Sequence, residues 1–144
     1  MIAVLNGANL NMLGQRDPAQ YGTLTLGELE SRIYQWARDA GTTARCFQTN
    51  HEGALIDHIH ECRGWANGVI INPGAWTHYS YAIRDALEIV TAPIVEVHLS
   101  DITKREEWRR TSVIADVVSH RVTGKGADGY HEAIIWLKKE TVSV

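Results

Sequence analysis

The stretch from Val69 to Leu99, VIINPGAWTHYSYAIRDALEIVTAPIVEVHL, carries the pattern that decides the fold. Residues 69–71 form a fully apolar run that stops at Asn72-Pro73-Gly74, which is typical of a buried strand followed by a turn. Apolar residues at helical spacing follow, and Thr77 can cap the helix that they predict. A second strand is expected at 94–99, after Pro93. This order predicts two parallel strands joined by a helix.

The same alternation extends to both ends of the chain. The remaining strands are expected at 2–5, 43–49 and 117–122. The first helix is expected to begin at the capping-box pattern of Thr25 and Glu28 and to stop at Gly41. The other helices are expected over 55–62, over 78–90 and through 133–137. Five strand–helix units predict an α/β fold, in which helices cover both faces of a parallel sheet and ligands bind beyond the carboxyl ends of the strands.

Composition narrows the possible functions. The 144 residues are about one domain's worth, so 1–144 is expected to be a single catalytic domain. A net charge of -3 gives no basic face for nucleic acid. With no basic leader and no apolar stretch long enough to span a bilayer, the protein is expected to be cytoplasmic. Cys46 and Cys62 lack metal-ligand or redox spacing and are expected to be buried thiols.

The connection after the first strand, residues 6–22, is unusually long. Typical strand-to-helix loops have about 2 to 6 residues, so this one is a candidate lid over a site. It holds Arg16 and Tyr21. A phenol becomes a useful base only if a cation stabilises its phenolate, and Arg16 could supply that cation. The alternative is an ordinary Asn- and Gly-rich turn with an exposed Arg and Tyr.

The run 94–99 has an unexpected polar face. Strand alternation puts Glu96, His98 and Ser100 on one face of it. Burying Glu and His costs several kcal/mol unless they are paired, so Glu96 is expected to hold His98 protonated and oriented as a general acid. The alternative is a half-exposed strand whose polar face meets water.

Other polar residues follow the third and fourth strands. Asn72 ends the third strand, His78 starts the next helix, and Asp85 shares a face of that helix with His78. Each alone is better explained by a turn or a surface side chain, and together they gain weight because they point to one place. Between 104 and 110 several cations could hold a carboxylate, and only one of these arginines is expected to face the site. The histidines at 51, 58 and 60 do not indicate a metal site.

Four separated blocks of the chain resemble type II 3-dehydroquinate dehydratases in order and spacing. The blocks are NGANLN at 6–11 with RDP at 16–18 and YG at 21–22, QTNHEG at 48–53, INPGA at 71–75 with TH at 77–78, and EVHLS at 96–100 with REEWR at 105–109. The similarity spans nearly the whole chain. Two departures are Ala8, where the family usually has Pro, and Ser119-His120-Arg121, where its last strand is usually blander.

The resemblance implies a flavodoxin-like three-layer sandwich with a five-stranded parallel sheet in the order 2-1-3-4-5. It implies trans elimination of water from 3-dehydroquinate to give 3-dehydroshikimate through an enolate, without a cofactor or metal. This reaction belongs to the shikimate pathway of aromatic amino acid biosynthesis and to quinate catabolism. The family assembles as trimers grouped into dodecamers, so the resemblance also implies a homo-oligomer.

The resemblance further implies roles for individual residues. Tyr21 would be the base and Arg16 its activator, while Asn9 would help to stabilise the enolate. His98, oriented by Glu96, would protonate the departing hydroxyl. The residues that would bind substrate are Asn72, His78, Leu99, Ser100 and Arg109, together with Asp85, which would reach the site of a neighbouring subunit.

Three other functions remain open from the sequence. A flavodoxin-like module that binds a flavin or nucleotide would share the fold and the location of the site. A metal-dependent hydrolase could be built on His51, His78 and His98. A member of the family that has lost activity is the third, if Ala8 misplaces the loop.

Overall fold

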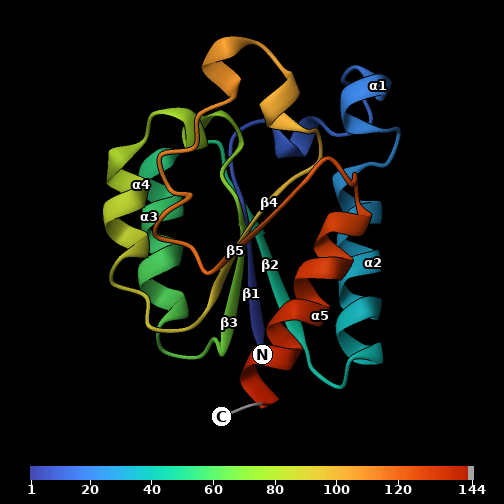
Figure 1. Ribbon diagram of the computed structural model, residues 1–144. Coiled ribbons are helices and arrows are strands. Elements are labelled where there is room, and N and C mark those ends of the chain that lie inside the picture. Colours follow the sequence, from blue (N-terminus) through green and yellow to red (C-terminus); the bar gives the residue numbers. More distant parts are fainter. Residues whose placement is uncertain (143–144) are drawn as a thin grey trace.

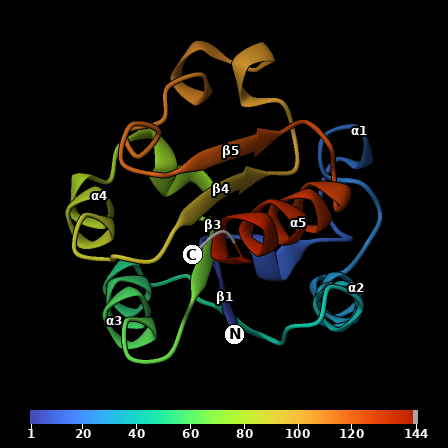
Figure 2. The ribbon, with the colours of Figure 1, turned by 60° about the horizontal axis from the view of Figure 1, so that its bottom comes forward.

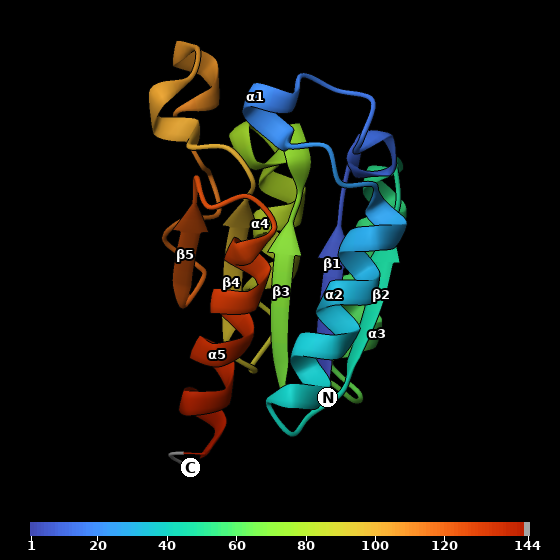
Figure 3. The same cartoon turned by 90° about the vertical axis from the view of Figure 1, so that its right-hand side faces the viewer.

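The computed structural model describes residues 1–142, and its centre is a five-stranded, all-parallel sheet. The strands are β1 (Ile2–Asn6), β2 (Ala44–Gln48), β3 (Gly68–Asn72), β4 (Ile94–His98) and β5 (His120–Thr123). They lie in the order β2-β1-β3-β4-β5, as Figure 3 shows. The flavodoxin-like order 2-1-3-4-5 predicted from the resemblance is therefore confirmed.

Helices cover both faces of this sheet, as predicted. The main helices are α2 (Leu26–Asp39), α3 (Glu52–Cys62), α4 (Tyr81–Leu87) and α5 (Asp128–Val142). Figures 1 and 2 show α2 and α5 on one face and α3 and α4 on the other. The capping box predicted for the first of these helices is present, because Thr25 accepts from the Glu28 amide and the Glu28 side chain accepts from the Thr25 amide.

The side chains of the strands alternate between two apolar cores. Val95, Val97 and Val122 pack in the core beneath α2 and α5. Ile71 and Ile94 pack in the core beneath α3 and α4. On β4, Ile94 and every second residue after it therefore point toward the face covered by α3 and α4. The polar residues Glu96 and His98 are on this face.

Two expected boundaries were wrong. Thr77 does not cap the helix α4; it lies in the 3-10 helix η2 (Gly74–His78), and Ser80 is the N-cap, accepting from the Ile83 amide. The last strand starts at His120 rather than at residue 117, because Val117 and Val118 lie in a turn that packs against the α3 and α4 core.

The connections at the carboxyl ends of the strands all lie at one end of the molecule (Figure 1). They include the short 3-10 helix η1 (Leu10–Met12), α1 (Pro18–Tyr21), η3 (Ile102–Lys104) and η4 (Glu107–Arg109). This is the end at which an open parallel sheet offers a site. Among residues 1–142, no helix is both long and apolar enough to span a membrane.

Candidate active site

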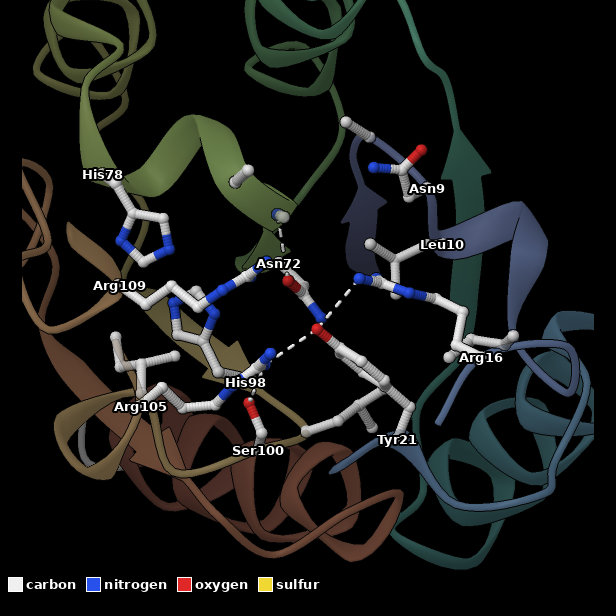
Figure 4. Close-up of a pocket in the computed structure, with 16 residues that line it drawn as sticks. Asn9, Leu10, Arg16, Tyr21, Asn72, His78, His98, Ser100, Arg105 and Arg109 are labelled. Carbon is white, nitrogen blue, oxygen red and sulfur yellow. Dashed lines mark hydrogen bonds between the residues drawn. The ribbon is translucent and has the colours of Figure 1, made fainter. Parts of the chain in front are cut away.

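A pocket lies beyond the carboxyl ends of β1, β3 and β4 (Figure 4). The loop after β1 contributes one side, η2 the second, and the segment after β4 the third. Nine residues singled out from the sequence line this pocket: Asn9, Arg16, Tyr21, Asn72, His78, His98, Leu99, Ser100 and Arg109. The sheet topology therefore brings together groups that are far apart in the sequence.

The hydroxyl of Tyr21 lies between two guanidinium groups, as Figure 4 shows. Arg16 Nη2 donates to the phenol oxygen at 2.9 Å, and its guanidinium carbon lies 3.8 Å from the ring centroid. Arg105 Nη1 donates to the same oxygen at 2.7 Å and to Ser100 Oγ at 3.2 Å. Two fixed positive charges beside one phenol oxygen stabilise the phenolate more than one would.

Sequence reasoning singled out Arg16 and missed Arg105. It also expected only one arginine of the segment 104–110 to face the site, which was wrong because both Arg105 and Arg109 line the pocket. The error arose because this segment is not one regular helix. Arg105 directly follows the 3-10 helix η3 and Arg109 ends the 3-10 helix η4, so side chains four residues apart reach the same cavity.

Glu96 and His98 form a buried hydrogen-bonded pair on β4. Their exposed fractions are 0% and 5%, so the alternative of a half-exposed strand with a hydrated polar face was wrong. His98 Nε2 lies 2.5 Å from Glu96 Oε2. Because this nitrogen is held by the carboxylate, Nδ1 is the ring nitrogen that can serve a ligand in the pocket.

The Glu96 carboxylate has further partners that the sequence did not reveal. Thr77 Oγ1 donates to Oε2 at 2.9 Å, and Ser112 Oγ lies 3.1 Å and 2.9 Å from the two oxygens. Burial alone would raise the pKa of Glu96. The hydrogen bond and charge of His98, the charge of Arg121 and the Ser112 hydrogen bond outweigh burial and lower that pKa. Glu96 is thus an anion held behind His98.

Asn72 is held by a buried network below the pocket. Its Nδ2 donates to the Tyr130 hydroxyl at 3.1 Å, and its Oδ1 accepts from the Gly74 amide at 3.1 Å. The Tyr130 hydroxyl donates in turn to Asn6 Oδ1 at 2.7 Å. Burial raises the pKa of Tyr130, so this phenol keeps the proton that it donates. One amide hydrogen of Asn72 remains for a ligand.

His78 stands at the opposite wall. Its Nδ1 donates to the Thr111 carbonyl at 2.7 Å, which leaves Nε2 as an acceptor. Burial lowers the pKa of His78; the Thr111 hydrogen bond raises it, and the charges of His98 and Arg109 lower it further. The net effect favours a neutral imidazole. Beside it, Arg109 Nε lies 2.5 Å from Glu106 and its guanidinium 4.1 Å from the Trp108 ring centroid.

Several residues named from the sequence lie elsewhere. Glu96 is behind the pocket wall, and Asp85 is exposed on α4, outside the pocket of its own chain. His51 precedes α3 and does not share the pocket with His78 and His98. Among residues 1–142, no group of three or more His, Cys, Asp or Glu side chains is arranged to hold a metal ion.

The two cysteines are also outside the pocket. Cys62 is buried as expected, whereas Cys46, on the edge strand β2, is only partly buried. Burial raises the pKa of the Cys46 thiol to about 12 and also raises that of Cys62.

These features define a flavodoxin-like α/β protein with a pocket whose side chains are chemically suited to proton transfer. A phenol flanked by cations and an imidazole held by a carboxylate line the same pocket, with neutral hydrogen-bonding side chains around them. A base and an acid placed in one cavity suit the removal of a proton and the protonation of a leaving group on one small molecule.

Comparison with known proteins assigns the chain to a family. The profile of the family described as dehydroquinase class II matches residues 1–138. A 3-dehydroquinate dehydratase from Syntrophotalea carbinolica is 53% identical over 135 residues, which cover 93% of this chain and 91% of that protein. One from Halalkalibacterium halodurans is 51% identical over 136 residues, 94% of each chain.

A solved structure supports the same family assignment. The crystal structure of type II dehydroquinase from Propionibacterium acnes superposes with a TM-score of 0.93 at 42% identity, covering 96% of this chain and 95% of that one. The chain belongs to the class II dehydroquinase family, whose members are hydro-lyases.

Proposed function

We propose that this protein eliminates water from 3-dehydroquinate to give 3-dehydroshikimate by a trans elimination through an enolate. The relatives named 3-dehydroquinate dehydratase support the overall reaction. The single observation that carries the mechanism is the placement of Tyr21, bonded by two guanidinium groups, in one pocket with the His98–Glu96 pair. The reaction would serve the shikimate or the quinate pathway.

Tyr21 is the proposed base. As phenolate, it takes a proton from the carbon beside the ketone, and the electron pair of that C–H bond moves into the enolate. Arg16 and Arg105 stabilise the phenolate before the transfer, and neither competes for the proton because guanidinium stays protonated. The charge that leaves Tyr21 in this step appears on the enolate oxygen.

The enolate requires donors that are already in place, because a proton beside a ketone becomes acidic enough only when the resulting oxyanion is stabilised. Asn9 is the proposed donor. It lines the pocket with a left-handed backbone (φ 71°), and its amide donates to Asn50 Oδ1 at 2.9 Å. That bond anchors the backbone from which the Asn9 side chain reaches the cavity.

His98 is the proposed acid. The enolate oxygen re-forms the C=O bond, and the electron pair of the enolate C=C forms a new C=C bond to the carbon that bears the hydroxyl. The C–O bond of that carbon breaks with its electron pair on the departing oxygen, and imidazolium supplies the proton that makes the leaving group water. Glu96 holds the other nitrogen of the ring and stabilises the imidazolium before the step. These steps are proton transfers among protein side chains and substrate, and they need no metal or cofactor.

The remaining pocket residues would bind the carboxylate and hydroxyls of the substrate. Arg109 supplies positive charge, while neutral His78 and Asn72 each keep one group free to accept or donate. Ser100 and the backbone at Leu99 complete the set at the end of β4.

We further propose that residues 1–144 act as a single catalytic domain within a homo-oligomer of trimers, assembled as a dodecamer, and that Asp85 completes the site of a neighbouring subunit. Asp85 is exposed on α4 and is outside its own pocket. Tyr81 at the start of the same helix and Tyr79, two residues before it, are 69% and 60% exposed, which suits contact with another chain.

The function is tested by following the ultraviolet absorbance of the conjugated enone of 3-dehydroshikimate after protein is mixed with 3-dehydroquinate. The parent and Tyr34→Phe, in which the changed phenol lies on α2, are expected to be active. Tyr21→Phe, with its fold checked by circular dichroism, is expected to lose about 10²- to 10⁴-fold in kcat.

Equal rates for the parent and Tyr21→Phe would keep the reaction and remove Tyr21 as its base. No absorbance change with a folded, assembled parent would refute the function.

A further inference from the structure

Arg121 lies outside the pocket and contacts Glu96, the carboxylate that holds His98. It lies on β5 directly opposite Glu96 in the sheet register, on the same face of the sheet. Its Nε is 3.1 Å from Glu96 Oε1. The Glu96 side chain is fully buried, whereas the Arg121 side chain is 32% exposed at the edge of the sheet. A cation therefore contacts Oε1 of the carboxylate, whereas the imidazole contacts Oε2.

Apart from the ion pair with Glu96, no hydrogen bond of the described residues holds the buried nitrogens of the Arg121 guanidinium in place. Within residues 1–142, Nε and Nη2 of Arg121 are buried without a hydrogen-bond partner of good geometry. A buried donor without a partner costs free energy, so the attraction between Arg121 and Glu96 must offset that cost. This arginine belongs to Ser119-His120-Arg121, the polar segment that departs from the family pattern.

A fixed cation beside a coupled carboxylate and imidazole acts on both groups in the same direction. It favours the deprotonated form of each, because every proton lost makes the pair more negative. The positive charge of Arg121 therefore offsets part of the stabilisation that the Glu96 carboxylate gives to the His98 imidazolium. The proton on His98 becomes easier to give to a leaving group.

We propose that Arg121 is a positioning residue that increases the acidity of His98 by acting through Glu96. The proposal deepens the proposed function and rests on it, because His98 is the acid of that mechanism. Arg121 touches neither the pocket nor, in the proposed reaction, the substrate.

Other polar and charged residues also surround Glu96 and His98. Thr77 on η2 and Ser112 contact Glu96 as neutral hydroxyls. The titratable or charged groups that share the pocket with His98 are His78, Arg16, Arg105, Arg109 and Tyr21. Because none of these residues is substituted in the Arg121 variants, the contribution of Arg121 can be measured separately.

The test is a pH titration of the His98 ring by ¹³C NMR, on the assembled protein labelled at its histidines. Comparison with His98→Asn identifies the signal among the seven histidines. In Arg121→Met the midpoint is expected to move upward. A charge in direct contact shifts a midpoint by about 1 to 3 units. Because Arg121 acts across Glu96 and is partly exposed, about half a unit to one unit is expected.

Matched variants separate charge from shape. Arg121→Lys keeps the charge and is expected to restore most of the parental midpoint. Lys125→Met also removes one positive charge, but from an exposed pair with Glu132, and is expected to leave the midpoint in place. Arg121→Gln replaces Arg121→Met if the latter does not fold. The alkaline limb of kcat against pH is expected to move with the NMR midpoint.

An unchanged or lowered midpoint in Arg121→Met overturns the proposal, as does an equal shift in Arg121→Lys or in Lys125→Met. The NMR comparison needs no turnover. If the parent does not convert 3-dehydroquinate, the proposed function fails by itself, and the midpoint still decides whether Arg121 controls His98.

Discussion

At the scale of single residues, Glu96 shows how a charge can be kept inside the protein. Two hydroxyls, one imidazole and one guanidinium surround its carboxylate, so every oxygen is paired although the side chain is fully buried. An unpaired carboxylate at this place would destabilise the fold by several kcal/mol or take up a proton. The same contacts that keep Glu96 ionised also hold the acid in position.

The lowered pKa of Glu96 predicts how stability depends on pH. A carboxyl with a lower pKa in the folded state contributes stability above its unfolded pKa of about 4.3, and the contribution is lost as the pH falls through the folded pKa. The parent should therefore lose part of its stability relative to Glu96→Gln below about pH 5. Urea unfolding of both proteins at several pH values measures this difference. A difference that does not change with pH would contradict the prediction.

At the scale of elements, the loop after β1 is held by close contact with the turn after β3. The Gly7 amide donates to the Asn72 carbonyl at 2.8 Å. Gly74 adopts a left-handed backbone with φ of 66°, and a Cβ there would lie 2.5 Å from the Ala8 carbonyl oxygen. This approach fixes the start of the segment that carries Asn9 to the pocket, and it does so with Ala at position 8.

Gly74→Ala is expected to push this loop away. The strained φ and the clash with backbone should cost about 1 to 3 kcal/mol of unfolding free energy. Because small displacements of catalytic groups are costly, kcat/KM should fall about tenfold or more. Thermal unfolding and steady-state kinetics measure the two effects.

Gly53→Ala is the matched control, since nothing lies within 4 Å of a Cβ built there, in the first turn of α3. It should be neutral or slightly stabilising. Equal behaviour of the two variants would show that the contact between the loop and the turn does not position the site.

At the scale of the whole molecule, the proposed sharing of sites between subunits can be tested by mixing. Tyr21→Phe lacks the base, and Asp85→Ala lacks the group proposed to reach a neighbouring site, so each alone should have low activity. In a random one-to-one mixture about half of the sites keep Tyr21, and about half of those receive an intact Asp85. About a quarter of the parental activity should therefore return after subunit exchange.

Analytical ultracentrifugation of each variant confirms that assembly is retained before mixing. If activity does not return although labelled subunits have exchanged, or if Asp85→Ala alone is fully active, Asp85 does not complete a neighbouring site.

Much of the fold followed from the sequence because it depends on local patterns. Apolar runs alternate with helical spacing, and the capping box at Thr25 marks the start of α2. The boundary errors arose where tertiary contacts override those patterns. Thr77 has the side chain of a helix cap, yet its hydroxyl donates to Glu96, and Ser80 caps α4 instead.

The sequence by itself determined the α/β class, the polar face of β4, the position of His98 and Asn72 at strand ends and the position of Tyr21 in the long connection after β1. These features follow from periodicity and chain order. Only the tertiary structure decided which groups act on them. Arg105 reaches Tyr21 across 84 positions, and Tyr130 reaches Asn72 across 58. Arg121 meets Glu96 through the register of two neighbouring strands. Such contacts form when helices and strands pack against one another, so no local pattern in the chain specifies them.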